Sequence, residues 1–512
     1  MKKKWISMLL CMAMTAAALA GCGDSGSADS GSAGSEAADS GTADSGSQTA
    51  EEPAGEVETI NVTYFSFNSI DDTAMVEEAV NKISEEKIGV RVKLNAMEGG
   101  QYMSQQTMLL SGSEDIDLIV TPLVTDAMNS GAFADMTDLV EEYGQDIKAV
   151  LGDNLEAGKY RGCLYGLPNL HEYASTPLLV YNGDIANELG LDMASVKKLE
   201  DLDGILAKVV EAYPDMSTPL YTGSSSGCLS SSYHDWDTLG DNLGVVMFDG
   251  ASDKVVNLYE TEKYRELVTT LHDFSQKGYL NADSAVLTEN YWSLVPEKMS
   301  FGCILNQHEL IAEEYTPSTG VNLEIVPLAE TYRTTSNVTT FLWRIMSTSK
   351  KQVSAMKFLN LLYSDAEVED LICNGIEGVH YQVTEDGKYT YPDGVDFANS
   401  TYYPNIGWVM PNGWLAGEWV GDIENYGEKM TEYNESAKAS PAYGFIFDSS
   451  NVANEVTACT NVVQQYCNSV EENGTVDVDS AIADLNKALK EAGIDTVIAE
   501  KQKQYDEFLS NQ

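Results

Sequence analysis

The chain has 512 residues and a formal net charge of −50, which arises from 80 acidic and 30 basic side chains. This charge argues against nucleic acid and against anionic membrane surfaces as partners, because like charges repel. The 456 residues that follow residue 56 are more than one hydrophobic core usually supports. We therefore expect two or more α/β lobes.

Residues 1–21 have the pattern of a signal peptide. Three lysines, Lys2–Lys4, precede an apolar stretch, Trp5–Ala18, that is too short to span a bilayer as a stable helix. Leu19-Ala20-Gly21-Cys22 resembles the bacterial lipobox, whose cysteine receives two acyl chains, enough for stable anchoring. The alternative is an ordinary secretory signal in which Cys22 is incidental. We expect lipidation at Cys22 and a location at the extracellular face of the cell membrane, in contact with the bilayer through this anchor alone.

Residues 22–56 form the expected lipid anchor and tether. From residue 23 they are rich in Ser, Gly, Ala and acidic residues, with no basic or aromatic residue. Such a stretch cannot bury enough apolar surface to offset the entropy of ordering, so we expect it to be disordered. A flexible chain of 34 residues spans roughly 30–35 Å on average, which holds a folded domain clear of the lipid headgroups.

Strand and helix patterns alternate from residue 58 onward. The first elements expected are strands at 58–65, 90–94 and 116–120, with helices at 71–87 and 102–110. Asp71-Asp72-Thr73 supplies N-cap residues for the first helix. This βαβαβ order implies a parallel sheet, in which ligands bind beyond the carboxyl ends of the strands. That position directs attention to Phe67, Asn68 and Thr121 as ligand-binding residues.

The same alternation continues along the chain. Further strands are expected at 178–182, 220–221 and 299–305, helices at 200–213, 263–277 and 352–363, and C-terminal helices at 451–470, 479–492 and 496–509.

Six cysteines follow the signal and the anchor, at positions 163, 228, 303, 373, 459 and 467. Cys459 and Cys467 are expected to share a helix about 12 Å apart, too far to bridge. We interpret the six as buried small side chains, with disulfides as the alternative.

Several segments resemble extracellular solute-binding proteins of ABC importers. They are SGSEDID at 111–117, GAFADMTDL at 131–139, GKYRGCLYGLP at 158–168, Tyr181-Asn182, the helix within 344–363, and Gly375–Gly378. Residues 434–448 and 492–509 are similar to the C-terminal domain of lipoproteins linked to complex-sugar uptake. Each segment alone has low specificity, and their order and spacing carry the resemblance.

The resemblance implies an α/β fold of the type II periplasmic-binding-protein class, in which two lobes joined by a hinge close on a ligand. Lobe 1 is expected at 57–174 plus 334–378, and lobe 2 at 175–327 plus 384–512 with the C-terminal helices. The crossovers are expected near 174–176, 327–333 and 377–383. The implied function is capture of an oligosaccharide for import, with membrane permease subunits of an ABC transporter as partners, no cofactor, and a monomeric state.

A sugar site needs aromatic faces and fixed polar groups. Besides the residues at the strand ends, the expected ligand-binding residues are Trp236, Asp237, Asn306, His308, Trp343 and Trp414. Trp408 and Trp419 complete a tryptophan cluster with Trp414. Packing of these aromatic residues within their own lobes is the alternative.

Other functions stay open at this stage. A surface glycoside hydrolase or lyase needs two carboxylates across a cleft, which 80 acidic residues would supply by chance. The sequence has no His-Glu-x-x-His or Cys-x-x-Cys motif, and its five histidines lack metal-spaced partners, so we expect neither catalysis nor a metal. An adhesion lipoprotein is a further alternative. Within the class of binding proteins, the acidic surface leaves a polyamine or a cationic peptide as an alternative ligand.

Overall fold

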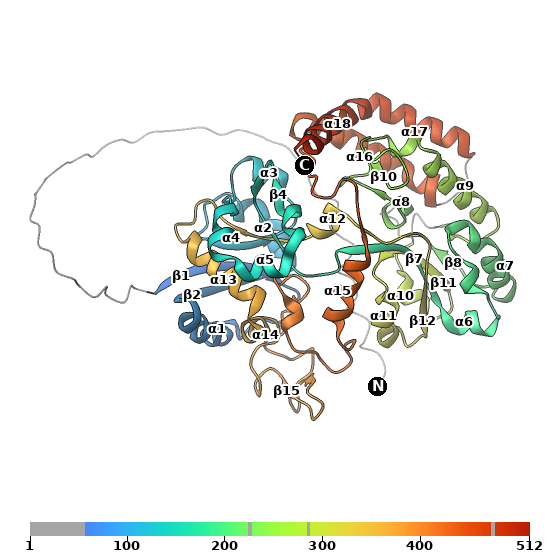
Figure 1. Cartoon of the computed structure of the whole chain (residues 1–512). Helices are drawn as coiled ribbons and strands as arrows, with labels where there is room; N and C mark the ends of the chain where they lie inside the picture. The colour runs from blue at the N-terminus through green and yellow to red at the C-terminus, as the bar shows by residue number, and fades with distance from the viewer. Residues whose placement is uncertain (1–56, 224–227, 284–286, 473–476, 512) are drawn as a thin grey trace, which may run out of the picture. The chain divides into compact units, whose positions relative to one another are not determined.

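The computed structural model describes residues 57–223, 228–283, 287–472 and 477–511. The expected signal peptide, the tether and Cys22 lie outside these residues. The described residues form two large sheets, of five and six strands, and each is surrounded by its own helices (Figure 1). In the described part of the chain no helix combines the length and the apolar character needed to cross a bilayer.

The first sheet has five strands in the order β2-β1-β3-β14-β6. These are β1 (Glu58–Ser66), β2 (Val90–Glu98), β3 (Leu118–Thr121), β14 (Leu342–Ile345) and β6 (Leu167–Pro168). β1 runs parallel to β2 and β3, with Val62 level with Leu94 and Leu118, so the expected βαβαβ unit is confirmed. β14 is antiparallel to β3.

The helices of the first lobe begin where local chemistry favours them. They are α1 (Thr73–Ile88), α2 (Gly99–Leu109), α3 (Thr125–Asn129), α4 (Thr137–Tyr143), α5 (Gln145–Leu151), α13 (Gln352–Ser364) and α14 (Ala366–Asn374). α2 starts earlier than predicted because the Glu98 carboxylate accepts from the backbone N–H groups of Gly100 and Gln101. Asp72 precedes α1 but makes no side-chain cap, and its carboxylate faces His380 Nε2 at 3.3 Å instead.

The second sheet has the strand order β17-β13-β7-β11-β8, and β12 also pairs with β7. These strands are β7 (Ala174–Asn182), β8 (Thr218–Tyr221), β11 (Ser300–Gln307), β12 (Leu323–Pro327), β13 (Tyr332–Arg333) and β17 (Lys438–Ala439). β7 lies at the centre of this sheet and is antiparallel to β11, with Val180 level with Cys303. Short pairs elsewhere are β4 (Lys159–Tyr160) with β5 (Cys163–Leu164), β9 (Trp236–Asp237) with β10 (Val246–Met247), and β15 (Gln382–Val383) with β16 (Tyr389–Thr390).

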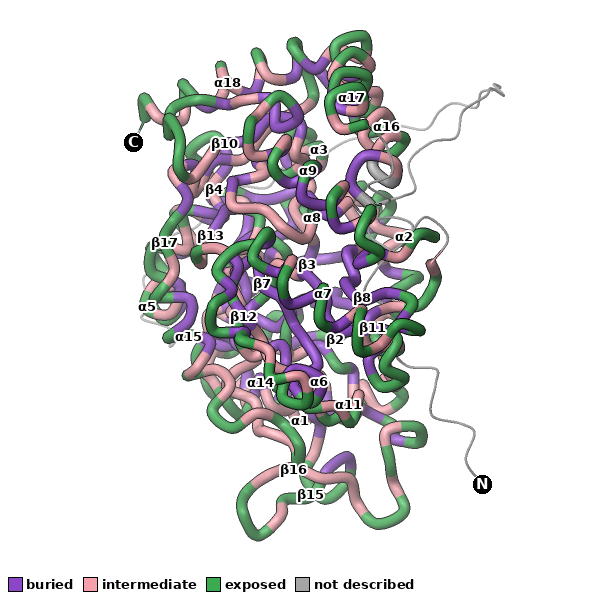
Figure 2. The backbone as a smooth tube through the Cα atoms, turned by 90° about the vertical axis from the view of Figure 1, so that its right-hand side faces the viewer, coloured by how far each residue is buried: buried purple, intermediate pink, exposed green. Residues whose placement is uncertain are grey.

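Helices cover the second sheet and extend to the C-terminus. They are α6 (Gly183–Glu188), α7 (Asp203–Ala212), α8 (Leu229–Ser232), α9 (Glu262–Gln276), α10 (Tyr291–Leu294), α11 (Ile311–Thr319), α12 (Thr335–Val338), α15 (Tyr426–Ser436), α16 (Ala453–Cys467), α17 (Val478–Ala492) and α18 (Ile494–Ser510). The last three confirm the predicted C-terminal helices. α17 is capped by the Asp477 side chain and ended by Gly493 at φ 101°, and its buried residues recur at helical spacing. Figure 2 shows this alternation of buried and exposed residues along α17 and α18.

The third link between the lobes differs from the expected one. Two links between the sheets run from β6 to β7 and from β13 to β14. The third was expected at 377–383, with residues from 384 in lobe 2. Tyr402, Ile406, Val409 and Met410 instead belong to the hydrophobic core around the first sheet. The chain therefore still packs in that core up to residue 410.

One cysteine departs from the interpretation as a free buried side chain. Cys228 is disulfide-bonded. Cys303, Cys373 and Cys459 are free and buried, whereas Cys163 is free and half-buried. The spacing argument excluded only a bond within one helix, so it left Cys228 able to pair elsewhere.

Candidate binding site

An aromatic surface lies at the carboxyl end of β1. The rings of Phe67 and Trp408 are stacked, with centroids 6.0 Å apart and planes 16° from parallel. Phe67 is 42% exposed and Trp408 40% exposed, and Phe341 packs edge-on against Trp408. Backbone bonds hold both residues, because Phe67 N–H donates to Pro404 and the Trp408 indole N–H donates to the Asn405 carbonyl. We call Phe67, Trp408 and Phe341 the aromatic platform. Its exposed faces can stack on a flat apolar surface of a ligand.

The aromatic platform is connected to the first crossover. Asn169 donates from Nδ2 to the Trp408 carbonyl at 2.7 Å, and its buried Oδ1 has no protein partner in the structure. The two ring nitrogens of His171 lie 2.9 Å from the Asn169 carbonyl and 2.8 Å from the Asn337 carbonyl. Since Asn337 lies within the second crossover, between β13 and β14, His171 ties the two crossovers together.

A second group of polar side chains lies at the end of β11 in the other lobe. Asn306 Nδ2 is 3.1 Å from His234 Nε2, and His234 Nδ1 is 3.2 Å from the Trp236 carbonyl. Burial lowers the pKa of His234 to about 4, so its ring is neutral at pH 7 and accepts through Nε2. Asn306 Oδ1 and Asp235 Oδ1 are buried and have no hydrogen-bond partner among the residues that the structure describes. Such atoms are rare in native proteins and mark positions for a ligand or an ordered water.

His308 belongs to an acidic cluster beside the first crossover. Its buried Nε2 lies 3.5 Å from Glu314 Oε1, and its Nδ1 has no protein partner among the described residues. The Tyr426 hydroxyl donates to Glu172. Burial, together with the charge of Glu172, raises the pKa of Glu314 to about 7. Burial also lowers the pKa of His308.

Four of the predicted ligand-binding residues are buried and already have partners. Trp343 donates from its indole to the Val409 carbonyl at 2.8 Å, and Trp236 donates to Asn242 Oδ1 at 2.9 Å. The Thr121 hydroxyl accepts from Arg344 Nε at 3.0 Å. The Asp237 carboxylate accepts from Ser440 Oγ and from the Leu239 N–H, and burial raises its pKa. In this structure these four residues are 0–1% exposed and form part of the lobe cores rather than a surface.

The remaining predicted residues keep accessible surface or an unpartnered atom. Phe67 lies on the aromatic platform, and Asn68 follows it half-buried. Asn306 is half-buried, and His308 is buried with its free Nδ1. Trp414 packs against Gly427 of α15 and beside Tyr433 and Met430, so one face of its ring supports that helix. Phe67 is connected to the first crossover through Trp408, whose carbonyl accepts from Asn169. His308 is connected to the same crossover through Tyr426, whose ring it meets edge-on and whose hydroxyl donates to Glu172.

Trp408, which stacks on Phe67 in the aromatic platform, was not among the predicted ligand-binding residues. It stands in a stretch without periodicity that was assigned to the other lobe, so nothing in the sequence placed it beside Phe67. The one available signal was its membership in a cluster of tryptophans near a Pro-Asn-Gly turn.

A separate pocket of about 820 Å³ opens beside α11. Its charged lining residues are Glu309, Glu313, Glu324, Asp422, Glu424 and Lys429. No aromatic side chain lines this pocket. Across the described ranges, no group of three or more His, Cys, Asp or Glu side chains is placed to hold a metal ion.

Two α/β lobes joined by short crossovers, with aromatic and amide groups at the strand ends, define a two-lobed binding protein. Residues 68–369 match the model for bacterial extracellular solute-binding proteins, and residues 441–510 match a domain of unknown function, DUF3502. The chain belongs to the family of bacterial extracellular solute-binding proteins.

Two curated relatives cover most of the chain. A carbohydrate ABC transporter substrate-binding protein of Streptococcus pneumoniae serotype 4 is 29% identical over 445 residues, covering 84% of this chain and 87% of that protein. Lipoprotein LipO of Bacillus subtilis is 22% identical over 420 residues, covering 76% of this chain and 75% of that protein.

Solved structures agree with this placement. The N-glycan transport solute binding protein (NgtS) of S. pneumoniae superimposes with a TM-score of 0.75 at 26% identity, covering 89% of this chain and 99% of that one. The same protein in complex with Man5GlcNAc gives a TM-score of 0.63 at 27% identity, with the same coverage of both chains. The fold is therefore of the type II solute-binding class, as predicted.

Proposed function

We propose that this chain is the substrate-binding component of an ABC importer and that it captures an oligosaccharide between its lobes. The observation that carries the proposal is the exposed, stacked pair Phe67 and Trp408 at the carboxyl edge of the first sheet. Sugar rings present apolar C–H faces, which stack on such rings, and hydroxyl rims, which need hydrogen-bond partners. Two buried side-chain oxygens without a partner among the described residues supply acceptors for hydroxyl groups. They belong to Asn169, beside the aromatic platform, and to Asn306, on β11 of the second sheet.

The same arrangement accounts for closure on the ligand. A sugar that contacts both lobes interacts more strongly with the closed form than with the open form. This difference in affinity shifts the population toward the closed form. The carbohydrate-transport relative and the glycan-binding structures support the choice of an oligosaccharide over smaller solutes.

The family binds solutes, and we propose that the chain carries no hydrolase activity. Glu172 and Glu314, the two carboxylates beside the first crossover, both interact with the Tyr426 hydroxyl, so this pair is engaged by the protein itself.

A ligand screen tests this proposal. Thermal-shift measurements followed by calorimetry on purified protein lacking residues 1–22 would compare a glycan panel with a panel of polyamines and cationic peptides. We expect glycans of two or more residues to raise the melting temperature, because ligand that binds only the native state stabilises it. No shift with any glycan would overturn the assignment.

The acidic pocket beside α11 supplies the second candidate, a cationic ligand. Five carboxylates and one lysine among its lining residues favour a polyamine or a basic peptide. Shifts with these cations alone, lost on replacing Glu309 and Glu313 by glutamine, would establish this candidate in place of the sugar.

We propose further that the mature chain is a monomer anchored through lipid on Cys22, close to its permease. A Cys22→Ala variant is expected to be released into the medium with its ligand affinity intact, since the binding residues lie in the folded lobes. Cell fractionation and immunoblotting would check the location, and a Ser25→Ala variant in the tether would serve as the matched control. Retention of the Cys22→Ala protein in the membrane fraction would contradict the anchor.

A further inference from the structure

The segment 440–450, which contains the start of the domain of unknown function (441–510), contacts both lobes, and we call it the C-terminal strap. It leaves β17 of the second sheet, where the Ser440 hydroxyl donates to the buried Asp237 carboxylate. Phe445 then packs against Tyr505 and Phe508 of α18, with ring centroids 5.2 and 5.7 Å away. The strap is therefore fixed to the second lobe by its own apolar side chains.

The middle of the strap contacts the second crossover. Gly444 N–H donates to Thr335 Oγ1 at 2.7 Å, and Thr335 begins α12, which lies within this crossover. The Tyr443 hydroxyl donates to Asn154 Oδ1 at 2.7 Å, and Arg333 Nη1 donates to the same oxygen at 3.3 Å. Asn154 lies in the short 3-10 helix Gly152–Gly158, whose neighbouring residues pack in the first core. The strap thus passes the point at which a hinge rotation takes place.

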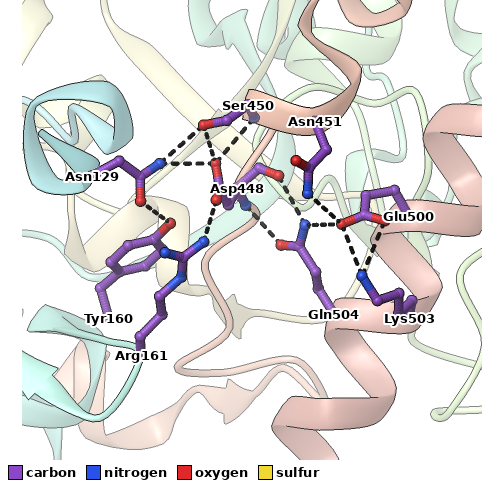
Figure 3. Close-up of polar contacts among 9 residues, drawn as sticks. All are labelled: Asn129, Tyr160, Arg161, Asp448, Ser450, Asn451, Glu500, Lys503 and Gln504. Carbon is purple, nitrogen blue, oxygen red and sulfur yellow. Dashed lines mark hydrogen bonds and ion pairs between the residues drawn. The ribbon is translucent and has the colours of Figure 1, made fainter.

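The end of the strap carries Asp448, whose carboxylate is held by the first lobe (Figure 3). Asn129 Nδ2, at the end of α3, donates to Asp448 Oδ1 at 2.9 Å. The Arg161 guanidinium, in the turn between β4 and β5, pairs with Asp448 Oδ2. The Tyr160 hydroxyl donates to Asn129 Oδ1 at 2.8 Å, which orients the amide toward the carboxylate.

The backbone of Asp448 is held by the second lobe. Gln504 of α18 accepts from the Asp448 N–H and donates to its carbonyl, both at 2.9 Å. Glu500, one turn earlier on α18, accepts from Gln504 and from Asn451 (Figure 3). Burial opposes ionisation of Asp448, but hydrogen bonds from Ser450 and Asn129 outweigh it and hold the pKa below its usual value. A buried, ionised side chain therefore joins α18 to the first lobe.

The distance from the crossover determines what this contact does when the lobes move. Asp448 lies four residues beyond Gly444, which places it at most about 13 Å away along the chain. A hinge rotation of about 15° at that distance displaces the carboxylate by up to about 3 Å. A hydrogen bond of 2.9 Å does not survive such a displacement. The contact is thus specific to one arrangement of the lobes.

We propose that the C-terminal domain of unknown function holds the lobes in the arrangement of this structure through Asp448, and so sets how readily the binding site closes. The domain then acts as a latch on the hinge motion. This role needs two lobes and a hinge, but it does not depend on whether the ligand is a sugar.

Single-molecule FRET on ligand-free protein tests the proposal, because no ligand identity enters the measurement. Dyes on non-canonical residues at the exposed positions Asp138 of α4 and Glu211 of α7 would report the distance between lobes while leaving the cysteines intact. The variants are Asp448→Ala, which removes the carboxylate, and Arg161→Gln, which removes only its mostly exposed partner and leaves no buried gap.

We expect Asp448→Ala to change the ratio of inter-lobe distance states by tenfold or more and Arg161→Gln by about threefold, because the exposed guanidinium is partly screened. Lys159→Gln and Lys503→Gln are the matched controls. Each removes a cation beside the latch whose carboxylate partner, Glu156 or Glu500, lies in the same lobe. Distance distributions unchanged in both latch variants would overturn the proposal, whether or not Asp448→Ala lowers the melting temperature.

Discussion

Replacement of Trp408 by alanine is expected to weaken oligosaccharide binding by roughly 10- to 100-fold. The indole is 40% exposed and stacked on Phe67, so the variant removes the larger half of the aromatic platform. Burying an apolar side chain of this size contributes about 1.5–3 kcal/mol, which corresponds to one to two powers of ten in Kd. Calorimetric titration with a glycan that binds the parent protein would measure the loss.

Trp292→Ala is the matched control for this measurement. Trp292 is also half-buried and stacked on another ring, that of Tyr315 at 3.8 Å, but it belongs to a different apolar cluster in the second lobe. We expect it to lower stability without changing affinity. Equal affinities for Trp408→Ala and the parent protein would show that the ligand does not use the aromatic platform.

Replacement of Asn434 by alanine is expected to destabilise the folded protein by about 2–4 kcal/mol. Its buried amide accepts from the N–H groups of Tyr173 and Ala174 at 2.8 and 3.0 Å and donates to the His171 carbonyl at 2.9 Å. Alanine leaves these three backbone groups of the first crossover unsatisfied, and each such group costs about 1–3 kcal/mol when buried. Thermal and urea unfolding, followed by circular dichroism, would measure the change.

Two companion variants identify the cause of that loss. Glu435→Ala changes the next residue of α15, which is exposed, and should stay within about 0.5 kcal/mol of the parent protein. Asn434→Asp keeps the acceptor oxygen for Tyr173 and Ala174, so it should recover part of the stability. If Asn434→Ala unfolds like Glu435→Ala, the crossover does not depend on this amide.

The elements of the fold could be predicted because strand composition and helical spacing are properties of short segments of sequence. The βαβαβ unit of residues 58–121 followed from strand composition and helical spacing, and Phe67 followed from the rule for carboxyl ends. The C-terminal helices had the same strong periodicity. The length of the chain predicted two or more lobes, and family resemblance then supplied how two lobes are joined by a hinge.

The site was harder to predict because side-chain direction is a tertiary property. Trp343 lies on a strand buried on both faces, so alternation could not tell core from cleft. Thr121 sits at the expected strand end, yet its hydroxyl is engaged by Arg344 from the neighbouring strand. Trp408 reaches Phe67 across more than 300 residues of sequence, a contact that only the folded chain creates.

The late position of the residues that complete both cores bears on how the protein leaves the cell. The core around the first sheet includes residues as far along as Met410, and that around the second sheet includes Val497. A growing chain would therefore lack part of each core until synthesis is nearly finished, and incomplete cores leave apolar surface exposed. Neither core is complete until most of the chain has been made, so we expect the chain to stay unfolded enough to pass through a secretion channel until most of it has crossed the membrane.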